Sequence, residues 1–359
     1  MLSTACALAT PGARAQPGAI PDPAPADPPA ALTDRGDDDL AGLLDLGRWR
    51  TRSVRLHWAN DGTLPNLIDD TDEYFTNGVE IGASFDPDPA PALAERLAPS
   101  DRWEDPRFGV GLAIQQRIYT PVDLTRTTPA PGTHPYGGYL GLSAALQRAD
   151  DDTHDHLGLD IGMVGESSFA EDIQKWIHID VIPEEIDPRG WGTQIPDELV
   201  ANVGVARTWK TEPADLGGLG LELLPRVRAD AGTMLVRAGV ETTLRVGVNL
   251  PDDFGPATML GFTDHTASPA SSDEVSFYMF GAVGADLVLH DVFIDGTVFN
   301  DDSRSADRES LVHRFRFGAV LRWRAIYAGW TQTFESDRFE KQGGTHAFGE
   351  IVLGISLEW

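Results

Sequence analysis

Three polar clusters stand at positions where the chain could carry out chemistry. They are Asn60-Asp61, Thr76-Asn77-Gly78, and His178 with Glu184. The first two follow or precede segments of alternating polarity, and the third lies in or just after a segment with helical periodicity. Loops and strand ends are where functional side chains collect on a rigid scaffold. These positions are therefore our candidates for a functional site.

The residue types favour a hard cation beside a general base. Calcium takes carboxylate and other oxygen ligands, so Asp61, Glu184 and oxygens around Thr76 are suitable ligands. His178 could then act as a general base, because an imidazole titrates near neutral pH. Cys6 is the single cysteine, which excludes a thiolate metal site. The chain also lacks the G-x-S-x-G, H-E-x-x-H and P-loop motifs of serine hydrolases, zincins and NTPases.

The stretch GESSFAEDIQKWIHIDVIPE, residues 165–184, predicts one short helix over about 168–182. Ser168 and Glu171 have the spacing of a capping box, and Pro183 is a helix stop. One apolar face is expected, from Ile173, Trp176, Ile177 and Val181. Two plainer interpretations stay open: a surface helix with an incidental histidine, and simple turns at Asn60-Asp61 and Asn77-Gly78.

The rest of the chain is typical of an all-β protein. Alternating segments predict about twelve strands, an even number as in bacterial membrane barrels. The expected strands are Ser53–Ala59, Gly78–Phe85, Phe108–Ile118, Gly137–Gln147, His156–Val164, Val200–Trp209, Leu221–Asp230, Val236–Val248, Val275–His290, Leu311–Trp323, Ile326–Phe334 and Ala347–Trp359. We expect the Asp/Pro-rich segments 86–106 and 250–273 to be long connections on the outer side of such a barrel.

The segment Leu311–Ala325 indicates which kind of β protein this is. Its odd-numbered residues are mostly apolar, whereas Arg314, Arg316, Arg322 and Arg324 share the other face. Four arginines on one face suit a polar lumen better than a sandwich core, where unpaired charge is costly. The last strand alternates in the same way and ends on Trp359, which resembles the C-terminal signal of bacterial outer-membrane barrels, although an edge strand of a soluble sheet would look the same. The truncated signal peptide, the acidic composition and the absence of cysteine pairs favour a transmembrane antiparallel barrel.

Composition agrees with an exported membrane protein. The chain has no run of 18 apolar residues, and its net charge of −28 argues against a nucleic-acid partner. Residues 1–15 resemble a truncated signal peptide with an A-x-A cleavage site, although an unstructured Ala-rich tail is the alternative. We expect a flexible Pro/Ala/Asp-rich leader over 16–50 and the barrel over 51–359.

Six motifs, in order, resemble the LpxR-type lipid A 3′-O-deacylases of Gram-negative outer membranes. They are WAND, DEYFTNGVEIG, QQRIYTPVDLTRT, HPYGGYL, DIGMVGESSFAEDIQKWIH and GWGTQIPDE. The resemblance implies a twelve-stranded barrel with its active site at the outer leaflet, between the wall and an extracellular loop helix. It also implies calcium-dependent hydrolysis of the 3′ acyloxyacyl ester of lipid A in lipopolysaccharide.

Carried over by motif, the family's active-site residues fall on Asn60, Asp61, Thr76, His178 and Glu184. The implied mechanism has His178 deprotonate a water that attacks the ester carbonyl, with calcium at Asp61, Glu184 and Thr76. Arg126 stands where the family keeps a basic residue for the anionic head group. Its neighbour Thr125 departs from members with a second basic residue, which puts phosphate recognition in doubt.

The resemblance predicts a monomer in the outer membrane, exported through a signal peptide. Two other functions remain open at this point. One is a non-enzymatic barrel, a porin or adhesion scaffold, and the other is an outer-membrane esterase that acts on phospholipid.

Overall fold

The computed structural model describes residues 50–61, 74–87, 107–177, 187–259 and 272–357. The chain divides into two units, residues 1–42 and 43–359, and every described residue belongs to the second. The signal and leader segments expected at 1–15 and 16–50 therefore lie almost wholly outside the described residues.

Thirteen strands make up one sheet. They are β1 Arg50–Asn60, β2 Tyr74–Asp86, β3 Arg107–Thr120, β4 Gly137–Ala149, β5 Thr153–Val164, β6 Glu198–Trp209, β7 Ala214–Asp215, β8 Gly220–Gly232, β9 Leu235–Val248, β10 Ser272–Asp291, β11 Leu311–Arg324, β12 Ile326–Glu335 and β13 His346–Ser356. The described residues also form two short helices, α3 Ala170–Trp176 and α4 Val292–Asp295, and 3-10 turns at Glu166–Ser168 and Trp191–Thr193.

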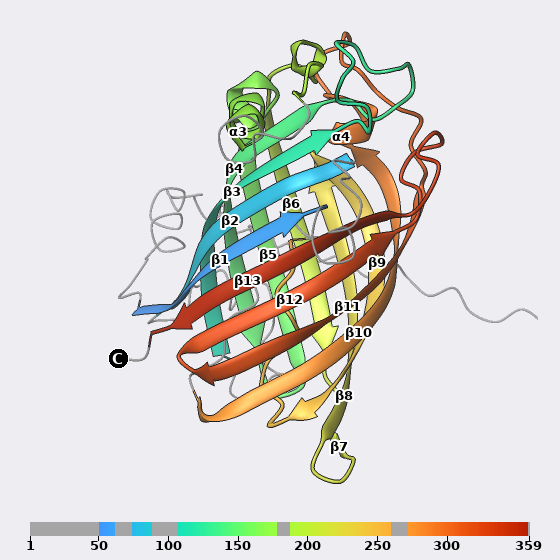
Figure 1. The fold of residues 1–359 in the computed structure, drawn as a ribbon. Coiled ribbons are helices and arrows are strands. Elements are labelled where there is room, and N and C mark those ends of the chain that lie inside the picture. The colour runs from blue at the N-terminus through green and yellow to red at the C-terminus, as the bar shows by residue number, and fades with distance from the viewer. Residues whose placement is uncertain (1–49, 62–73, 88–106, 178–186, 260–271, 358–359) are drawn as a thin grey trace, which may run out of the picture. The chain divides into compact units, whose positions relative to one another are not determined.

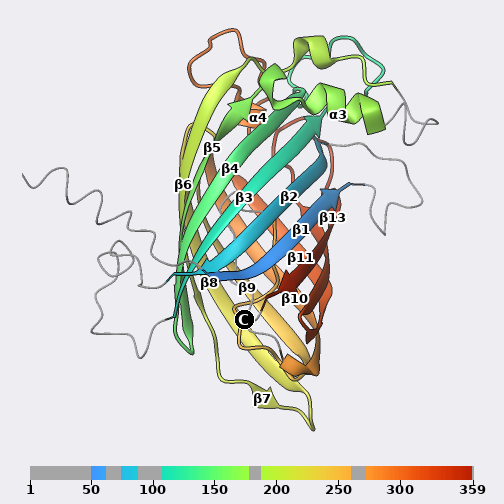
Figure 2. The ribbon, with the colours of Figure 1, turned by 90° about the vertical axis from the view of Figure 1, so that its left-hand side faces the viewer.

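The sheet closes into an antiparallel barrel of twelve strands (Figures 1 and 2). β1 pairs with β13, and β6 pairs with β8, so every wall strand has two neighbours. β7 pairs only with β8 and extends from the wall as a short hairpin. The twelve strands predicted from the alternation are confirmed, and β7 was not predicted because two residues carry no periodic signal.

Alternation along the strands separates an apolar outer face from a polar lumen. On β11, Leu311, Phe315 and Leu321 are exposed, whereas Arg314 and Arg316 are buried. Arg314 bonds Glu335 and Asp286 at 2.9 Å each, so charge that faces the lumen is paired there. Arg324 ends the strand with φ of 52°, and its guanidinium carbon lies 5.3 Å from the centre of the Trp323 ring.

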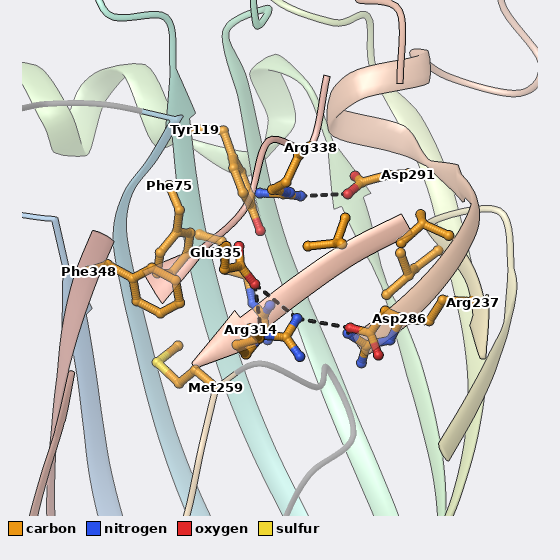
Figure 3. A pocket seen from close by; sticks show the side chains of 14 residues that line it. Phe75, Tyr119, Arg237, Met259, Asp286, Asp291, Arg314, Glu335, Arg338 and Phe348 are labelled. Atoms are coloured by element: carbon orange, nitrogen blue, oxygen red, sulfur yellow. Dashed lines mark hydrogen bonds and ion pairs between the residues drawn. The ribbon is translucent and has the colours of Figure 1, made fainter. Parts of the chain in front are cut away.

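An apolar layer crosses the lumen near the end that carries α3. Phe75, Tyr119, Tyr139, Val200, Leu235, Val312 and Phe348 belong to it, from strands all round the wall. The layer borders a cavity of about 70 Å³, which four arginines and three carboxylates also line (Figure 3). The lumen is thus packed with side chains at this level.

A segment of the β9–β10 connection enters the lumen from the opposite end. The Arg245 guanidinium binds Asp253 and donates to the Pro251 carbonyl at 2.9 Å. Further along, the Met259 N–H donates to Glu350 at 2.9 Å, and Met259 joins the apolar layer. Residues 250–259 therefore fill the lumen below that layer.

The connections after β2 and β9 begin at the same end of the barrel. Register pairs Arg50 with Asp86 and Ser53 with Ser356, so the connection after β2 begins at the end where β1 starts and β13 finishes. The β9–β10 connection lies at this same terminus end, because β9 and β10 alternate in direction with the other strands. Most of the predicted outer connections, residues 88–106 and 260–271, lie outside the described residues, and the strand ends that flank them lie at the end opposite α3. Successive antiparallel strands run in opposite directions, so the end at which a connection lies follows only from counting the strands that precede it.

Among the described residues, no helix is long and apolar enough to cross a membrane.

Candidate functional site

Three of the predicted site residues meet at the helix end of β1 and β2. The side-chain amide of Asn60 donates to the Thr76 carbonyl at 2.8 Å, and the Asp61 N–H donates to the same carbonyl at 3.4 Å. Asp61 and Thr76 are almost fully buried, at 1% and 3% exposure. Asn60, Asp61 and Thr76 thus form one polar cluster. Two separate turns, the plainer interpretation of the sequence, would not bring them into contact.

A bulge in β2 explains why Thr76 faces its partners. The register of β2 against β3 shifts between Phe75 and Asn77, so Phe75 and Gly78 both face the lumen and Thr76 faces outward. Tyr74, just before the bulge, has φ of 61°, a left-handed conformation that costs a non-glycine residue about 1 kcal/mol or more. Its hydroxyl donates to the Gln342 carbonyl at 2.8 Å, which holds the strained backbone in place.

Thr120 completes the cluster and was not singled out from the sequence. Its hydroxyl lies 2.7 Å from that of Thr76, and the side chain is fully buried. Thr120 ends β3, where Tyr119 faces the lumen and its neighbours on the strand face outward. Its position at the end of the QQRIYT segment is the one feature of the sequence that points to it. A threonine at the end of a strand does not by itself show which residue of the next strand it contacts.

Asn60, Thr76 and Thr120 of the cluster lie on the outer face of the wall, above an apolar surface. Below it on the same strands, Trp58, Leu56 and Val54 of β1 and Ile81 of β2 are exposed and point outward. A polar site therefore adjoins an apolar wall on the membrane side of the barrel. Ala59 and Phe75 of the same two strands, in contrast, face the lumen.

The helix α3 packs on this same outer face (Figure 2). Ala170 and Ile173 contact a cluster with Ile118, which faces outward from β3. Gly138 makes the approach possible, because a Cβ there would lie 2.0 Å from the Ser168 hydroxyl. The indole N–H of Trp191 donates to the Gln174 amide at 2.8 Å, and this bond is buried.

The helix departs from its predicted details. The residue at its N-cap is Phe169, and Ser168 donates to the Gly165 carbonyl at 2.6 Å, so the predicted capping box does not form. Trp176 is 59% exposed, so it does not lie on the buried face, where Ala170 and Gln174 do. The 3-10 turn before the helix rotates its face relative to an ideal start at Ser168. The part of the predicted helix beyond Ile177 lies outside the described residues.

His178 and Glu184 also lie outside the described residues. Arg126 is described: it is exposed in the β3–β4 connection and donates to the Thr128 carbonyl at 3.3 Å. The structure therefore brings Asn60, Asp61 and Thr76 together and leaves Arg126 in a loop of its own.

The described side chains that could bind a metal ion in this cluster all offer oxygen atoms, which suit a hard cation. Asp61 supplies a buried carboxylate, and the hydroxyls of Thr76 and Thr120 are adjacent. No group of three or more His, Cys, Asp or Glu side chains in the described ranges could hold a metal ion. The donor types fit calcium, with Asp61 as the single described carboxylate of the predicted set.

A buried histidine supports the loops at this end. His134 lies between Tyr119, stacked at 5.9 Å, and Phe339, and its Nδ1 is 2.7 Å from the Pro135 carbonyl oxygen. Burial lowers the pKa of His134 to about 4, because desolvation disfavours the charged ring. His134 is thus neutral at physiological pH, as a structural member of the HPYGGYL motif.

Comparison with known proteins gives a family and a solved structure of the same fold. The family model described as "Outer membrane protein LpxR" matches residues 23–357. The solved structure of LpxR from Salmonella typhimurium superposes with a TM-score of 0.68 at 17% identity, covering 85% of this chain and 100% of that one. No curated protein sequence matches the chain.

Other solved barrels are less similar. The β domain of the Bordetella autotransporter BrkA has a TM-score of 0.44 at 8% identity, covering 86% of this chain and 99% of that one. The translocator domain of NalP from Neisseria meningitidis has a TM-score of 0.37 at 9% identity, covering 89% and 91%. Both scores are too low to carry an argument about this chain.

Proposed function

The chain belongs to the LpxR family of outer membrane proteins, and from this premise we propose that it is a calcium-dependent lipid A 3′-O-deacylase. It would hydrolyse the 3′-linked acyloxyacyl ester of lipid A in the outer leaflet, as a monomer exported through a signal peptide. The substrate would reach the site from the membrane plane.

One observation carries this proposal: Asn60, Thr76 and Thr120 of the polar cluster lie on the outer face of the wall, directly above exposed apolar residues. An ester in an amphiphile has a polar carbonyl next to long acyl chains. Such a substrate would place its chains along Trp58 and Leu56 and its ester beside Asn60 and Thr76. A water-soluble substrate would have no use for a site on the membrane side of a barrel.

The roles we propose for the residues follow their chemistry. His178 would take a proton from the attacking water, because an imidazole is a suitable base near neutral pH. Asp61, Glu184 and Thr76 would hold calcium, which when bound polarises the ester carbonyl. Asn60 and Thr76 would orient these groups, since the Asn60 amide already fixes the Thr76 backbone.

The packed lumen supports an enzyme over a porin. The apolar layer of Phe75, Tyr139, Val312 and Phe348 crosses the barrel, whereas a porin keeps a water-filled channel. A phospholipid esterase would use the same outer-face site, so the substrate distinguishes it from the lipid A deacylase.

The experiment is mass spectrometry of lipid A after incubation with the refolded chain, with calcium and with a chelator. We expect calcium-dependent loss of the 3′ acyloxyacyl group. No mass change by folded protein, with release of fatty acid from phospholipid instead, would favour the esterase. Bis- and monophosphorylated lipid A should be compared, because Thr125 beside Arg126 predicts weaker dependence on phosphate. Faster hydrolysis of the bis-phosphorylated form than of the monophosphorylated form would contradict that part.

A further inference from the structure

Three charged side chains lie in a row on the outer face of the wall, at the terminus end. Arg148 of β4, Asp155 of β5 and Arg207 of β6 are direct cross-strand neighbours. Asp155 binds Arg148 at 2.9 Å and Arg207 at 2.6 and 2.7 Å. Asp155 and Arg207 point to the same side of their strands as the exposed Leu159 and Val203, which is the outer side. Two guanidinium groups thus flank one carboxylate in this row, and that of Arg207 is half-exposed.

A second row, apolar, lies one pleat nearer the helix end. Leu146 is opposite Leu157, Leu157 is opposite Val205, and Val205 is opposite Ala229. A groove of about 420 Å³ runs between the two rows across β4, β5, β6 and β8. The four lumen-facing residues between the rows also border it, at its floor. One side of the groove is therefore cationic and the other is apolar.

An acidic turn lies on the other side of the cationic row. The β4–β5 connection is Asp150, Asp151 and Asp152, and the last two are exposed. A turn of this length is typical of the periplasmic end of a membrane barrel. Along the wall toward this rim, the order is thus apolar, cationic, acidic.

We propose that this groove binds a phospholipid whose head group carries both a phosphate and a terminal ammonium, such as phosphatidylethanolamine. Its acyl chain would lie along Leu146, Leu157 and Val205, its phosphate on Arg207, and its ammonium beside Asp151 and Asp152. Arg207 is 44% exposed and within reach of a phosphate, whereas Arg148 is 6% exposed and binds Asp155 from the neighbouring strand β4. Guanidinium–phosphate hydrogen bonds are charge-assisted and strong.

This site is separate from the proposed catalytic cluster. The cluster lies at the helix end, where β3 finishes at Thr120, and the groove lies near the terminus-end turn of β4 and β5. Loss of lipid binding at the groove therefore tests a different property from loss of hydrolysis.

The experiment is native mass spectrometry of the refolded full chain in detergent, with dioleoyl phosphatidylethanolamine, dioleoyl phosphatidylglycerol or inorganic phosphate added. Arg207→Gln should lower affinity for phosphatidylethanolamine about tenfold, the loss expected from one charged hydrogen bond. Val205→Trp should do the same by filling the groove while every charge stays. The control is Arg324→Gln, which removes an exposed cation at the same end, outside the groove.

The double change Asp151→Asn with Asp152→Asn should remove the preference for phosphatidylethanolamine over phosphatidylglycerol. Folding of each variant is checked by heat-modifiable gel mobility. Wild-type affinity in both Arg207→Gln and Val205→Trp would overturn the proposal. So would equal binding of the two lipids by the wild-type chain, or displacement of the lipid by inorganic phosphate at millimolar concentration, since the latter indicates a simple anion site.

Discussion

The Thr76 and Thr120 hydroxyls lie 2.7 Å apart, across the bulge that turns Thr76 toward the outer face. Each hydroxyl has one proton, so one threonine must donate to the other. If Thr120 donates, the Thr76 proton is directed away from the pair and its remaining lone pair is oriented. Thr120 is thus a positioning residue for Thr76.

Replacing Thr120 with Val should lower kcat/KM about tenfold, because loss of one neutral hydrogen bond is worth at most about 1.5 kcal/mol. Thr120→Ser should restore most of the activity. Thr243→Val, which removes a buried hydroxyl on β9, is the control and should leave turnover unchanged. Equal activity of Thr120→Val and wild type would refute the positioning role.

Replacing His178 with Ala should reduce hydrolysis by about 10²–10⁴-fold, the usual contribution of a general base. The barrel should still fold and show heat-modifiable gel mobility, since none of the strand pairings in the described wall involves His178. His313→Ala, at an exposed strand position, is the control. Retained activity in His178→Ala would remove the base assignment.

The calcium assignment predicts altered metal dependence. Asp61→Ala and Glu184→Ala should each raise the calcium concentration for half-maximal activity about 10- to 100-fold, or remove activity. Asp150→Ala, an aspartate at the opposite end, should leave the calcium titration unchanged. Wild-type calcium dependence in both site variants would contradict the ligand role of these carboxylates.

Strand number and the sidedness of the strands were predictable, because alternation of polarity reports directly on a barrel wall. Arg314 and Arg316 face the lumen as expected. Their partners were not predictable: Asp286 and Glu241 lie 28 and 75 residues away in sequence. Such pairing depends on register, which a single sequence does not specify.

Two features of the site also required the structure. The bulge at Thr76 is invisible in an alternation pattern, yet it decides which face this residue occupies. The capping box at Ser168 and Glu171 is a local signal that the tertiary contact of Ser168 with Gly138 overrides. Local rules fail here where one element packs closely against another.

The bond between Trp191 and Gln174 predicts a role in placing α3. Trp191→Phe removes the N–H and leaves the buried Gln174 oxygen without this donor, which costs about 1–3 kcal/mol. Since α3 precedes His178 in sequence, we expect a several-fold loss of kcat; the cost falls on local opening of α3, so the urea midpoint of the barrel should stay unchanged. Trp330→Phe is a matched control, because its indole nitrogen has no hydrogen-bond partner within the described residues. Equal kcat in the two variants would refute the idea.

The buried His134 predicts a pH-dependent loss of stability. In the unfolded chain a histidine takes up a proton near pH 6.5, whereas burial holds the pKa of His134 at about 4. Between these values the unfolded state binds more protons, so stability falls as pH falls from 6.5 to 4, by about 3 kcal/mol in all. His134→Phe keeps the stacking on Tyr119 and should remove this part of the slope. Urea unfolding of both proteins at pH 8, 6, 5 and 4 measures the difference, with His313→Phe as the exposed control. Parallel pH profiles for wild type and His134→Phe would show that His134 does not titrate on unfolding in this window.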